Sequence, residues 1–200
     1  MARSIFFLIV AFGMLQWASA QTAYEITSSK MTIAGTSNLH DWESNVSKVQ
    51  ASADLTLDGN LLKAINSLSV TIPVNGIKSS KGSAMDKRTY SALKSDQHAN
   101  ITYKLGSVSA LEKSGNDYKI KTSGSLTVAG VTRTISMDVK GKVLQDGSLQ
   151  FEGSRSILMT EYGIDPPTAL MGTMKTGNEV TIGFSVKMTP TVSNNRTTGK

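Results

Sequence analysis

The chain has 200 residues, of which 39% are hydrophobic and 18% are charged, and its formal net charge is +6. It contains no cysteine, which excludes disulfide bonds, thiolate nucleophiles and cysteine metal sites. The charge is modest and the lysines are spread along the chain. Nucleic acid is therefore not indicated as a partner, whereas a weak attraction to anionic membrane surfaces is compatible with this charge.

The first twenty residues have the pattern of a targeting segment. Arg3 precedes an apolar run from Ile5 to Leu15, and Ala18-Ser19-Ala20 supplies the small residues of a signal-peptidase site. The run is shorter than the roughly 20 residues that cross a bilayer. We therefore expect residues 1–20 to be a signal peptide that is removed, with Gln21 as the mature start. The protein would then be exported, to the periplasm or the outside of the cell.

Most of the remaining chain alternates apolar and polar residues with a period of two. This pattern runs through Tyr24–Ile33, Val49–Leu57, Leu68–Val74, Asn100–Leu111, Tyr118–Val128, Ile135–Val139, Leu149–Phe151 and Val180–Met188. Such alternation places one face of a strand on a core and the other in water, which antiparallel sheets permit. Turn signals such as Asp58-Gly59-Asn60 and Asp146-Gly147 separate the runs. We expect about eight strands, joined largely as hairpins.

Breaks in the alternation carry their own predictions. The register changes between Ser28 and Met31 and between Val46 and Val49, and both places are interpreted as β-bulges. Pro73 lacks a backbone N–H, so it belongs at the edge or end of a strand or in a bulge.

Two segments depart from the strand pattern. Ser83, with Asp86 three residues later, predicts a helix start, and the helix would run to about Lys94. The segment Leu158–Lys175 contains Pro166-Pro167 and is predicted to be a loop that leads into a short helix at Thr168–Met171. These segments leave one domain over residues 21–189 and a polar tail, 190–200, that we expect to be disordered.

The pattern predicts an all-β fold, a single antiparallel sheet of about eight strands with one or two short helices. A closed barrel would remove the sheet edges and leave room for one small ligand. A two-sheet sandwich with a filled core accommodates the alternation nearly as well, and periodicity alone does not separate the two folds.

Three segments resemble the YceI-like family of exported polyisoprenoid-binding proteins. They are Gly35–Trp42 (GTSNLHDW), Met85–Leu105 with His98 between its helix and its strand, and Tyr162–Gly177 (YGIDPPTALMGTMKTG). The resemblance covers essentially residues 22–189, and the third segment is the most specific. It implies a lipocalin-like barrel with an internal pocket for a long hydrophobic chain, and it implies no catalytic residues.

Groups that could support catalysis are sparse. The chain has two histidines, His40 and His98, with Asp41 beside the first, and no pair of these has metal-ligand spacing. Ser37 and Ser44 lie in no recognisable nucleophile elbow. We therefore expect no enzyme, no catalytic residue, no metal and no cofactor. Basic residues surround the expected helix, and they are interpreted as a solvated face: Lys78, Lys81, Lys87, Arg88 and Lys94.

The function expected is binding, and carriage or storage, of a long-chain isoprenoid or fatty amphiphile inside the barrel. The alternative is a filled sandwich that acts as an interaction or stress-response module without a small ligand. The two non-strand segments should cover the ligand, and the last strand should face it. The expected contacts are His40, Trp42, Met85, Tyr90, Leu93, Leu158, Met159, Ile164, Leu170, Met171, Ile182 and Phe184. His40 has a second interpretation, as a turn residue whose ring bonds the backbone while Trp42 plugs the barrel end.

Overall fold

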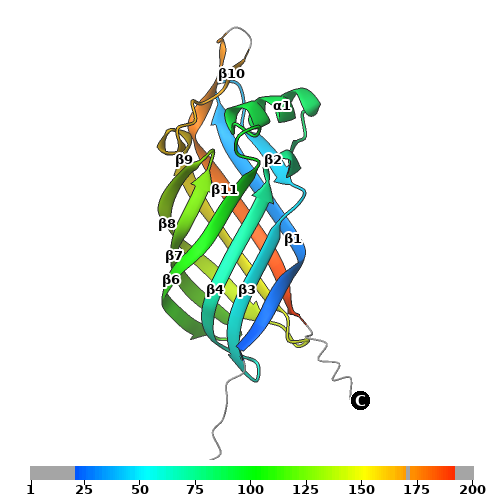
Figure 1. The fold of residues 1–200 in the computed structure, drawn as a ribbon, viewed down its shortest axis with the longest axis vertical. Coiled ribbons are helices and arrows are strands. Elements are labelled where there is room, and N and C mark those ends of the chain that lie inside the picture. The colour runs from blue at the N-terminus through cyan, green and yellow to red at the C-terminus, as the bar shows by residue number, and fades with distance from the viewer. Residues whose placement is uncertain (1–20, 170–171, 192–200) are drawn as a thin grey trace, which may run out of the picture.

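The computed structural model describes residues 21–169 and 172–191, and antiparallel strands dominate it (Figure 1). The strands are β1 (Gln21–Ser37), β2 (Trp42–Val46), β3 (Gln50–Asp58), β4 (Leu61–Pro73), β5 (Ile77–Ser79), β6 (Asn100–Ser114), β7 (Asp117–Val128), β8 (Val131–Val143), β9 (Leu149–Leu158), β10 (Thr168–Ala169) and β11 (Met174–Pro190). The helix α1 spans Ser83–Ala92, and two 3-10 turns, η1 and η2, span Val74–Gly76 and Met159–Tyr162.

Eight of these strands close into a barrel. Their order around the barrel is β11-β9-β8-β7-β6-β4-β3-β1, and β1 pairs with β11 from Tyr24↔Pro190 to Ser37↔Thr176. The predicted antiparallel, eight-stranded, lipocalin-like barrel is confirmed. The sandwich alternative is wrong, because the first and last strands hydrogen-bond to each other and close one continuous sheet.

The two ends of the barrel differ. The lower end carries the tight β3–β4, β6–β7 and β8–β9 turns, and the upper end carries α1, η2 and the β1–β2 turn (Figure 1). At the upper end β1 leaves β3 and pairs with β2 through Thr32–Gly35, and β2 pairs in turn with β5. A short two-stranded extension therefore lies beside α1.

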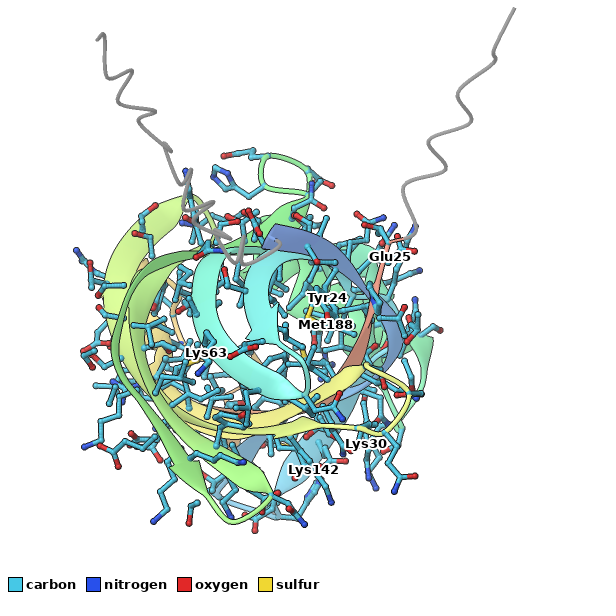
Figure 2. All side chains as sticks on the ribbon, turned by 90° about the horizontal axis from the view of Figure 1, so that it is seen from below. Tyr24, Glu25, Lys30, Lys63, Lys142 and Met188 are labelled. Atoms are coloured by element: carbon cyan, nitrogen blue, oxygen red, sulfur yellow. The ribbon has the colours of Figure 1, made fainter. Side chains whose placement is uncertain are left out.

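The alternation in the sequence produces the two faces of the wall. On β7, for example, Tyr118 and Ile120 are buried while Lys119 and Lys121 are exposed. The view along the barrel places Tyr24 and Met188 inside the ring and Lys30 outside it (Figure 2). The lower end is filled by a compact cluster of buried side chains: Tyr24, Ala53, Leu55, Leu62, Tyr118, Ile120, Leu149, Phe151 and Met188.

The breaks in alternation have mixed outcomes. β1 has a register shift between Ile26 and Ser28, next to the bulge expected there. The bulge expected between Val46 and Val49 is wrong, because Val46 ends β2 and the next strand begins only at Gln50. Pro73 is the last residue of β4, where a residue without an N–H is tolerated.

The helix α1 forms where it was expected, but its cap was assigned incorrectly. Gly82 is the N-cap, and it adopts a φ of 91°, which favours glycine. The Asp86 carboxylate accepts a hydrogen bond from the Ser79 N–H at 2.7 Å, so it anchors the helix to β5 and takes no part in a capping box with Ser83. No helix within residues 21–169 or 172–191 has the length and apolarity needed to cross a bilayer.

The segment after β9 also differs from its prediction. Thr168 and Ala169 are extended and pair with Lys175 and Met174, so the short helix expected to start there is absent from these two residues. Gly172, with a φ of 86°, provides the left-handed residue that this hairpin needs. Residues 170 and 171, the rest of that expected helix, lie outside the described residues.

Pro190 and Thr191, the first two residues of the expected tail, are attached to the barrel. Pro190 still pairs with Tyr24, and the Thr191 N–H and hydroxyl donate to the Ala23 carbonyl oxygen at 2.8 and 3.0 Å. Residues 192–200 and the expected signal peptide, residues 1–20, lie outside the described residues.

Candidate functional site

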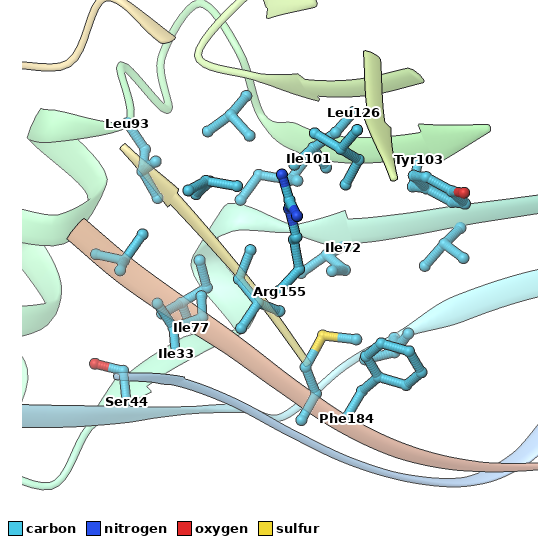
Figure 3. Close-up of a pocket in the computed structure, with 18 of the residues that line it drawn as sticks. Ile33, Ser44, Ile72, Ile77, Leu93, Ile101, Tyr103, Leu126, Arg155 and Phe184 are labelled. Carbon is cyan, nitrogen blue, oxygen red and sulfur yellow. The ribbon is translucent and has the colours of Figure 1, made fainter. Parts of the chain in front are cut away.

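The barrel encloses a cavity of about 510 Å³ above the cluster at its lower end. This volume lies within the range of about 300–1,000 Å³ that is typical of small-molecule pockets. Aliphatic side chains from many strands project into it, as Figure 3 shows for Ile33, Ile72 and Leu126. The cavity wall is therefore built from the inward faces that the sequence alternation predicts.

The last strand contributes the longest stretch of this wall. Val180, Ile182, Phe184, Val186 and Met188 all line the cavity, as their alternation predicts. Ile182 and Phe184 thus lie where the expected ligand contacts should be.

Both non-strand segments contribute to the upper end of the cavity. From α1 and the residue that follows it come Met85 and Leu93, and from the segment after β9 come Met159 and Ile164. Met159 and Ile164 are buried, whereas Met85 and Leu93 are half-buried at the rim. These four expected contact residues, distant in the sequence, meet around one opening.

The β1–β2 turn brings His40 and Trp42 to the same end. The Trp42 Nε1–H donates to the Thr36 carbonyl oxygen at 3.0 Å, which fixes the indole on the cavity wall. His40 lines the cavity but is exposed. The Ser37 side chain holds this turn, because its hydroxyl donates to the His40 carbonyl oxygen at 2.7 Å. The His40 ring makes none of the side-chain hydrogen bonds found in the described part of the chain.

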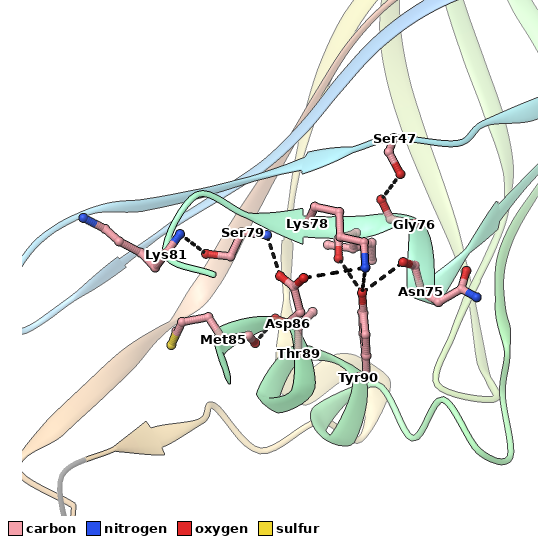
Figure 4. Close-up of polar contacts among 11 residues, drawn as sticks. Ser47, Asn75, Gly76, Lys78, Ser79, Lys81, Met85, Asp86, Thr89 and Tyr90 are labelled. Atoms are coloured by element: carbon pink, nitrogen blue, oxygen red, sulfur yellow. Dashed lines mark hydrogen bonds and ion pairs between the residues drawn. The ribbon is translucent and has the colours of Figure 1, made fainter. Parts of the chain in front are cut away.

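Tyr90 has a different role from the one expected, because it does not line the cavity. Its hydroxyl accepts a hydrogen bond from Lys78 Nζ at 2.7 Å and lies 2.9 Å from the Asn75 carbonyl oxygen (Figure 4). The Lys78 ammonium also lies 3.6 Å from the Asp86 carboxylate. This network ties α1 to η1 and β5, so Tyr90 positions the helix at the rim.

Leu158 was also assigned to the wrong face. Its side chain is 38% exposed, whereas the neighbouring Met159 is 9% exposed and lines the cavity. The strand ends at Leu158 and η2 begins at Met159, so the expectation that both would face the ligand fails at this junction. Leu170 and Met171, the two remaining expected contacts, lie outside the described residues.

This geometry, a closed barrel around an apolar cavity with a helix at its rim, agrees with a comparison of sequences. A profile of the YceI-like domain family matches residues 19–188, most of the chain. The chain belongs to this family. A search of curated protein sequences found no significant match.

Solved structures share the YceI-like fold. A polyisoprenoid-binding domain from Saccharophagus degradans superimposes with a TM-score of 0.65 at 12% identity, covering 85% of this chain and 99% of that one. BcnA from Burkholderia cenocepacia gives 0.61 at 20% identity, covering 80% and 95%. The YceI protein of Campylobacter jejuni gives 0.51 at 16% identity, covering 96% and 99%. At these identities the likeness establishes the fold alone.

Three polar residues on the wall of this YceI-like barrel escaped the sequence analysis. Arg155 lies on the inward face of β9, in phase with Phe151 and Ile157, and it projects into the cavity (Figure 3). The alternation itself was the signal that could have revealed it. Tyr103 and Tyr162 also line the cavity, and their buried hydroxyls have no hydrogen-bond partner among the described residues.

Burial raises the pKa of both phenols above the ordinary value, so both remain protonated near neutral pH. The Thr122 hydroxyl opposes the rise in the pKa of Tyr103. That hydroxyl itself donates to the Met137 carbonyl oxygen at 3.4 Å. Each phenol hydroxyl is therefore a buried donor that surrounding atoms cover. No group of three His, Asp or Glu side chains that could hold a metal ion occurs among residues 21–169 and 172–191.

Proposed function

We propose that this protein binds a long-chain apolar ligand, an isoprenoid or other lipid-like amphiphile, inside the barrel and carries or stores it. The observation that supports this most directly is the cavity of about 510 Å³, walled by aliphatic and aromatic side chains. The Saccharophagus degradans neighbour, described as a polyisoprenoid-binding domain, supports the same ligand class. We propose binding in preference to catalysis because the polar groups on the wall are few and do not form a nucleophile with its base.

Burial of an alkyl or isoprenyl chain is sufficient for affinity. Each buried CH₂ contributes about 0.8 kcal/mol, so a chain of about twenty carbons would gain roughly 16 kcal/mol before costs. Association costs about 4–15 kcal/mol, so such a chain binds without a catalytic or metal anchor.

The rim is the proposed route of access. Strands are held in the wall by continuous ladders of hydrogen bonds, whereas α1 and η2 interrupt the ladder at the upper end. We propose that Met85, Leu93, Met159 and Ile164 contact the ligand at the rim and that His40 and Trp42 flank it. Ile182 and Phe184 would contact the ligand deeper in the barrel. The targeting pattern of residues 1–20 supports action in an exported compartment, the periplasm or the exterior.

Native mass spectrometry of protein purified from its own host tests this function. We expect a bound species that is released by organic extraction and identified as a long hydrophobic chain. Repeatedly empty spectra, together with no uptake of a fluorescent long-chain probe by the purified protein, would show that the proposal is wrong.

A pair of variants on β11 locates the binding. Ile182→Gln places an amide on the cavity wall and should weaken probe binding by roughly tenfold, because the amide loses water without gaining a partner. Thr181→Gln, on the other face of the same strand, is the matched control and should bind as the unmodified protein does. Equal binding by both variants would place the probe outside the barrel.

A further inference from the structure

Arg155 is a cation on the inward face of β9, in a part of the wall where its neighbours are mainly aliphatic (Figure 3). It pairs with Ile182 in the β9–β11 ladder, and its side chain extends into the cavity among aliphatic residues such as Ile72 and Ile101 (Figure 3). None of the ion pairs or hydrogen bonds found within residues 21–169 and 172–191 involves the Arg155 guanidinium. Its charge thus faces the ligand space without a counter-charge.

Tyr162 borders the same cavity but cannot share this role. Its side chain is 0% exposed, and its hydroxyl, which has no hydrogen-bond partner in the described part of the chain, is covered by surrounding atoms. The Arg155 guanidinium is therefore the donor that a head group at this level of the cavity can reach.

The position of Arg155 places its charge in the upper part of the barrel. Arg155 lies near the end of β9, two residues before the inward Ile157, and η2 turns the chain directly after that strand. The Arg133 Nε–H donates to the Glu161 carbonyl oxygen at 3.0 Å, which ties this turn to β8.

The Arg155 guanidinium is both accessible and unpaired. Its side chain is exposed, so the charge is open to the cavity and is not enclosed by atoms of the wall. A guanidinium has a planar fork of N–H donors that matches a carboxylate or a phosphate. An accessible cation that projects among aliphatic side chains, without an acceptor of its own, indicates that the acceptor arrives with the ligand.

We propose that Arg155 forms a head-group site for an anionic carboxylate or phosphate at one end of the chain ligand. The apolar tail would then occupy the cavity toward Phe184 and Met188. This inference rests on the proposed carrier function and specifies which amphiphiles the barrel prefers.

Two other features of the cavity could compete for the head group, and they serve as controls. Lys81 and Arg88 lie at the rim near α1, so they could hold an anion at the entrance. Tyr103 is a second buried phenol, but a Cβ added to Gly124 would lie 2.5 Å from its hydroxyl, so that oxygen is packed against the β7 backbone.

Matched pairs of amphiphiles test the head-group preference. Dissociation constants are measured on lipid-free protein for palmitic acid, hexadecyl phosphate and hexadecanol, and for farnesyl phosphate and farnesol. We expect each anion to bind at least about tenfold more tightly than the alcohol with the same chain, since hydrogen bonds to charged groups are worth more than neutral ones. The palmitic acid and hexadecyl phosphate arms distinguish a carboxylate from a phosphate head.

The outcomes separate this inference from the carrier function. If none of the five compounds binds, both the carrier function and the head-group site are wrong. If acids and alcohols bind equally well, the protein carries chains but the head-group site is wrong.

Four variants locate the preference. Arg155→Met should abolish the preference for anions while leaving hexadecanol binding intact. Arg88→Gln, Tyr103→Phe and Tyr162→Phe should leave it unchanged. Loss of the preference in Arg88→Gln or Tyr103→Phe, with Arg155→Met unaffected, would place the head elsewhere and overturn the proposal.

Thermal melting of the ligand-free variants gives a readout that is independent of binding. Arg155→Met removes an unpaired charge from the cavity, so the Tm should stay the same or rise. A marked fall in Tm would assign Arg155 a structural role and contradict the proposal. Should that variant fail to fold, Arg155→Gln carries the same binding test.

Discussion

The indole of Trp42 lies directly against the Cα of Gly35: a Cβ added to Gly35 would come within 2.5 Å of Trp42 Cζ2. The two residues are cross-strand partners in the β1–β2 pair. Trp42 also lines the cavity, so the absence of a side chain at Gly35 is what allows a large aromatic ring to form this part of the upper wall.

Substitution of Gly35 by alanine should therefore destabilise the protein. The added methyl group must displace the indole or the strand, and overpacking of this kind costs about 1–3 kcal/mol. Urea denaturation measures the change in the free energy of unfolding. The control is Gly183→Ala, where the new Cβ would meet only Thr32 Oγ1, at 3.4 Å, and should be tolerated. Equal effects of the two substitutions would argue against the close Trp42–Gly35 packing.

The end of β9 offers a test of the rim with neighbouring residues. Met159→Gln places an amide on the cavity wall and should weaken binding of a fluorescent long-chain probe more than it weakens folding. Leu158→Gln, one residue earlier, changes an exposed side chain and should leave binding unchanged. Probe binding that survives Met159→Gln would move the site of access away from η2.

The two ends of the barrel should respond differently to loss of a large side chain. Leu149 is 0% exposed within the cluster at the lower end, so Leu149→Ala should cost about 2–5 kcal/mol of stability. Phe184 faces the cavity and is only partly buried, so Phe184→Ala should cost less and should mainly weaken chain binding. A larger loss of stability for Phe184→Ala than for Leu149→Ala would indicate a filled core at that level.

Asp146 should make stability depend on acid. Hydrogen bonds from the Ser148 hydroxyl, from Lys187 and from the Ser148 N–H hold the pKa of Asp146 well below its ordinary value of 3.8. A depressed pKa means that the folded state binds the proton less readily than the unfolded state. The stabilisation is therefore complete above the ordinary pKa and is lost as the pH falls from there toward the lowered pKa.

The Asp146 prediction is checked by comparing the unmodified protein with Asp146→Asn. The asparagine variant should be less stable near neutral pH, and the difference should shrink as the pH falls below about 4. Asp58→Asn is the control, because Asp58 pairs with Lys63 more loosely, at 3.6 Å. A stability difference that stays constant down to the lowest pH would remove Asp146 as its source.

Removal of divalent metals should have no effect. Chelation should change neither the Tm nor the amount of bound chain. His98→Ala may be compared directly, since the His98 ring packs against Gly130, where an added Cβ would lie 2.5 Å from Cε1. A stoichiometric metal that is lost from this variant would reopen the question of catalysis.

The sequence was sufficient to predict which strand residues face inward, because each inward residue of β11 follows from local alternation. The sequence was insufficient to predict that the sheet closes into a barrel. Closure depends on the pairing of β1 with β11, which lie far apart in the chain, and no short-range pattern indicates that contact. Which residues line the cavity at the rim was predicted only in part. Leu158 and Met159 diverge at the junction with η2, and Tyr90 turns to Lys78 because α1 must be held on β5.

Arg155 was missed for a different reason. The alternation was followed only through Leu149–Phe151, whereas β9 continues to Leu158, so Arg155 lay beyond the expected strand. A polar residue at an inward position of a strand whose other inward residues are apolar is thus a candidate site residue.

We expect the pairing of β1 with β11 to form late in folding. The hairpins β3–β4, β6–β7, β7–β8 and β8–β9 join neighbours in the sequence and can form early, whereas the seam between Tyr24 and Pro190 needs both ends of the domain. Until the final strand docks, the inner wall is an open apolar surface exposed to water and prone to aggregation. Docking of β11 would thus close the barrel around the cavity. A hydrophobic chain bound to the open inner wall at that moment would be enclosed without passing the rim.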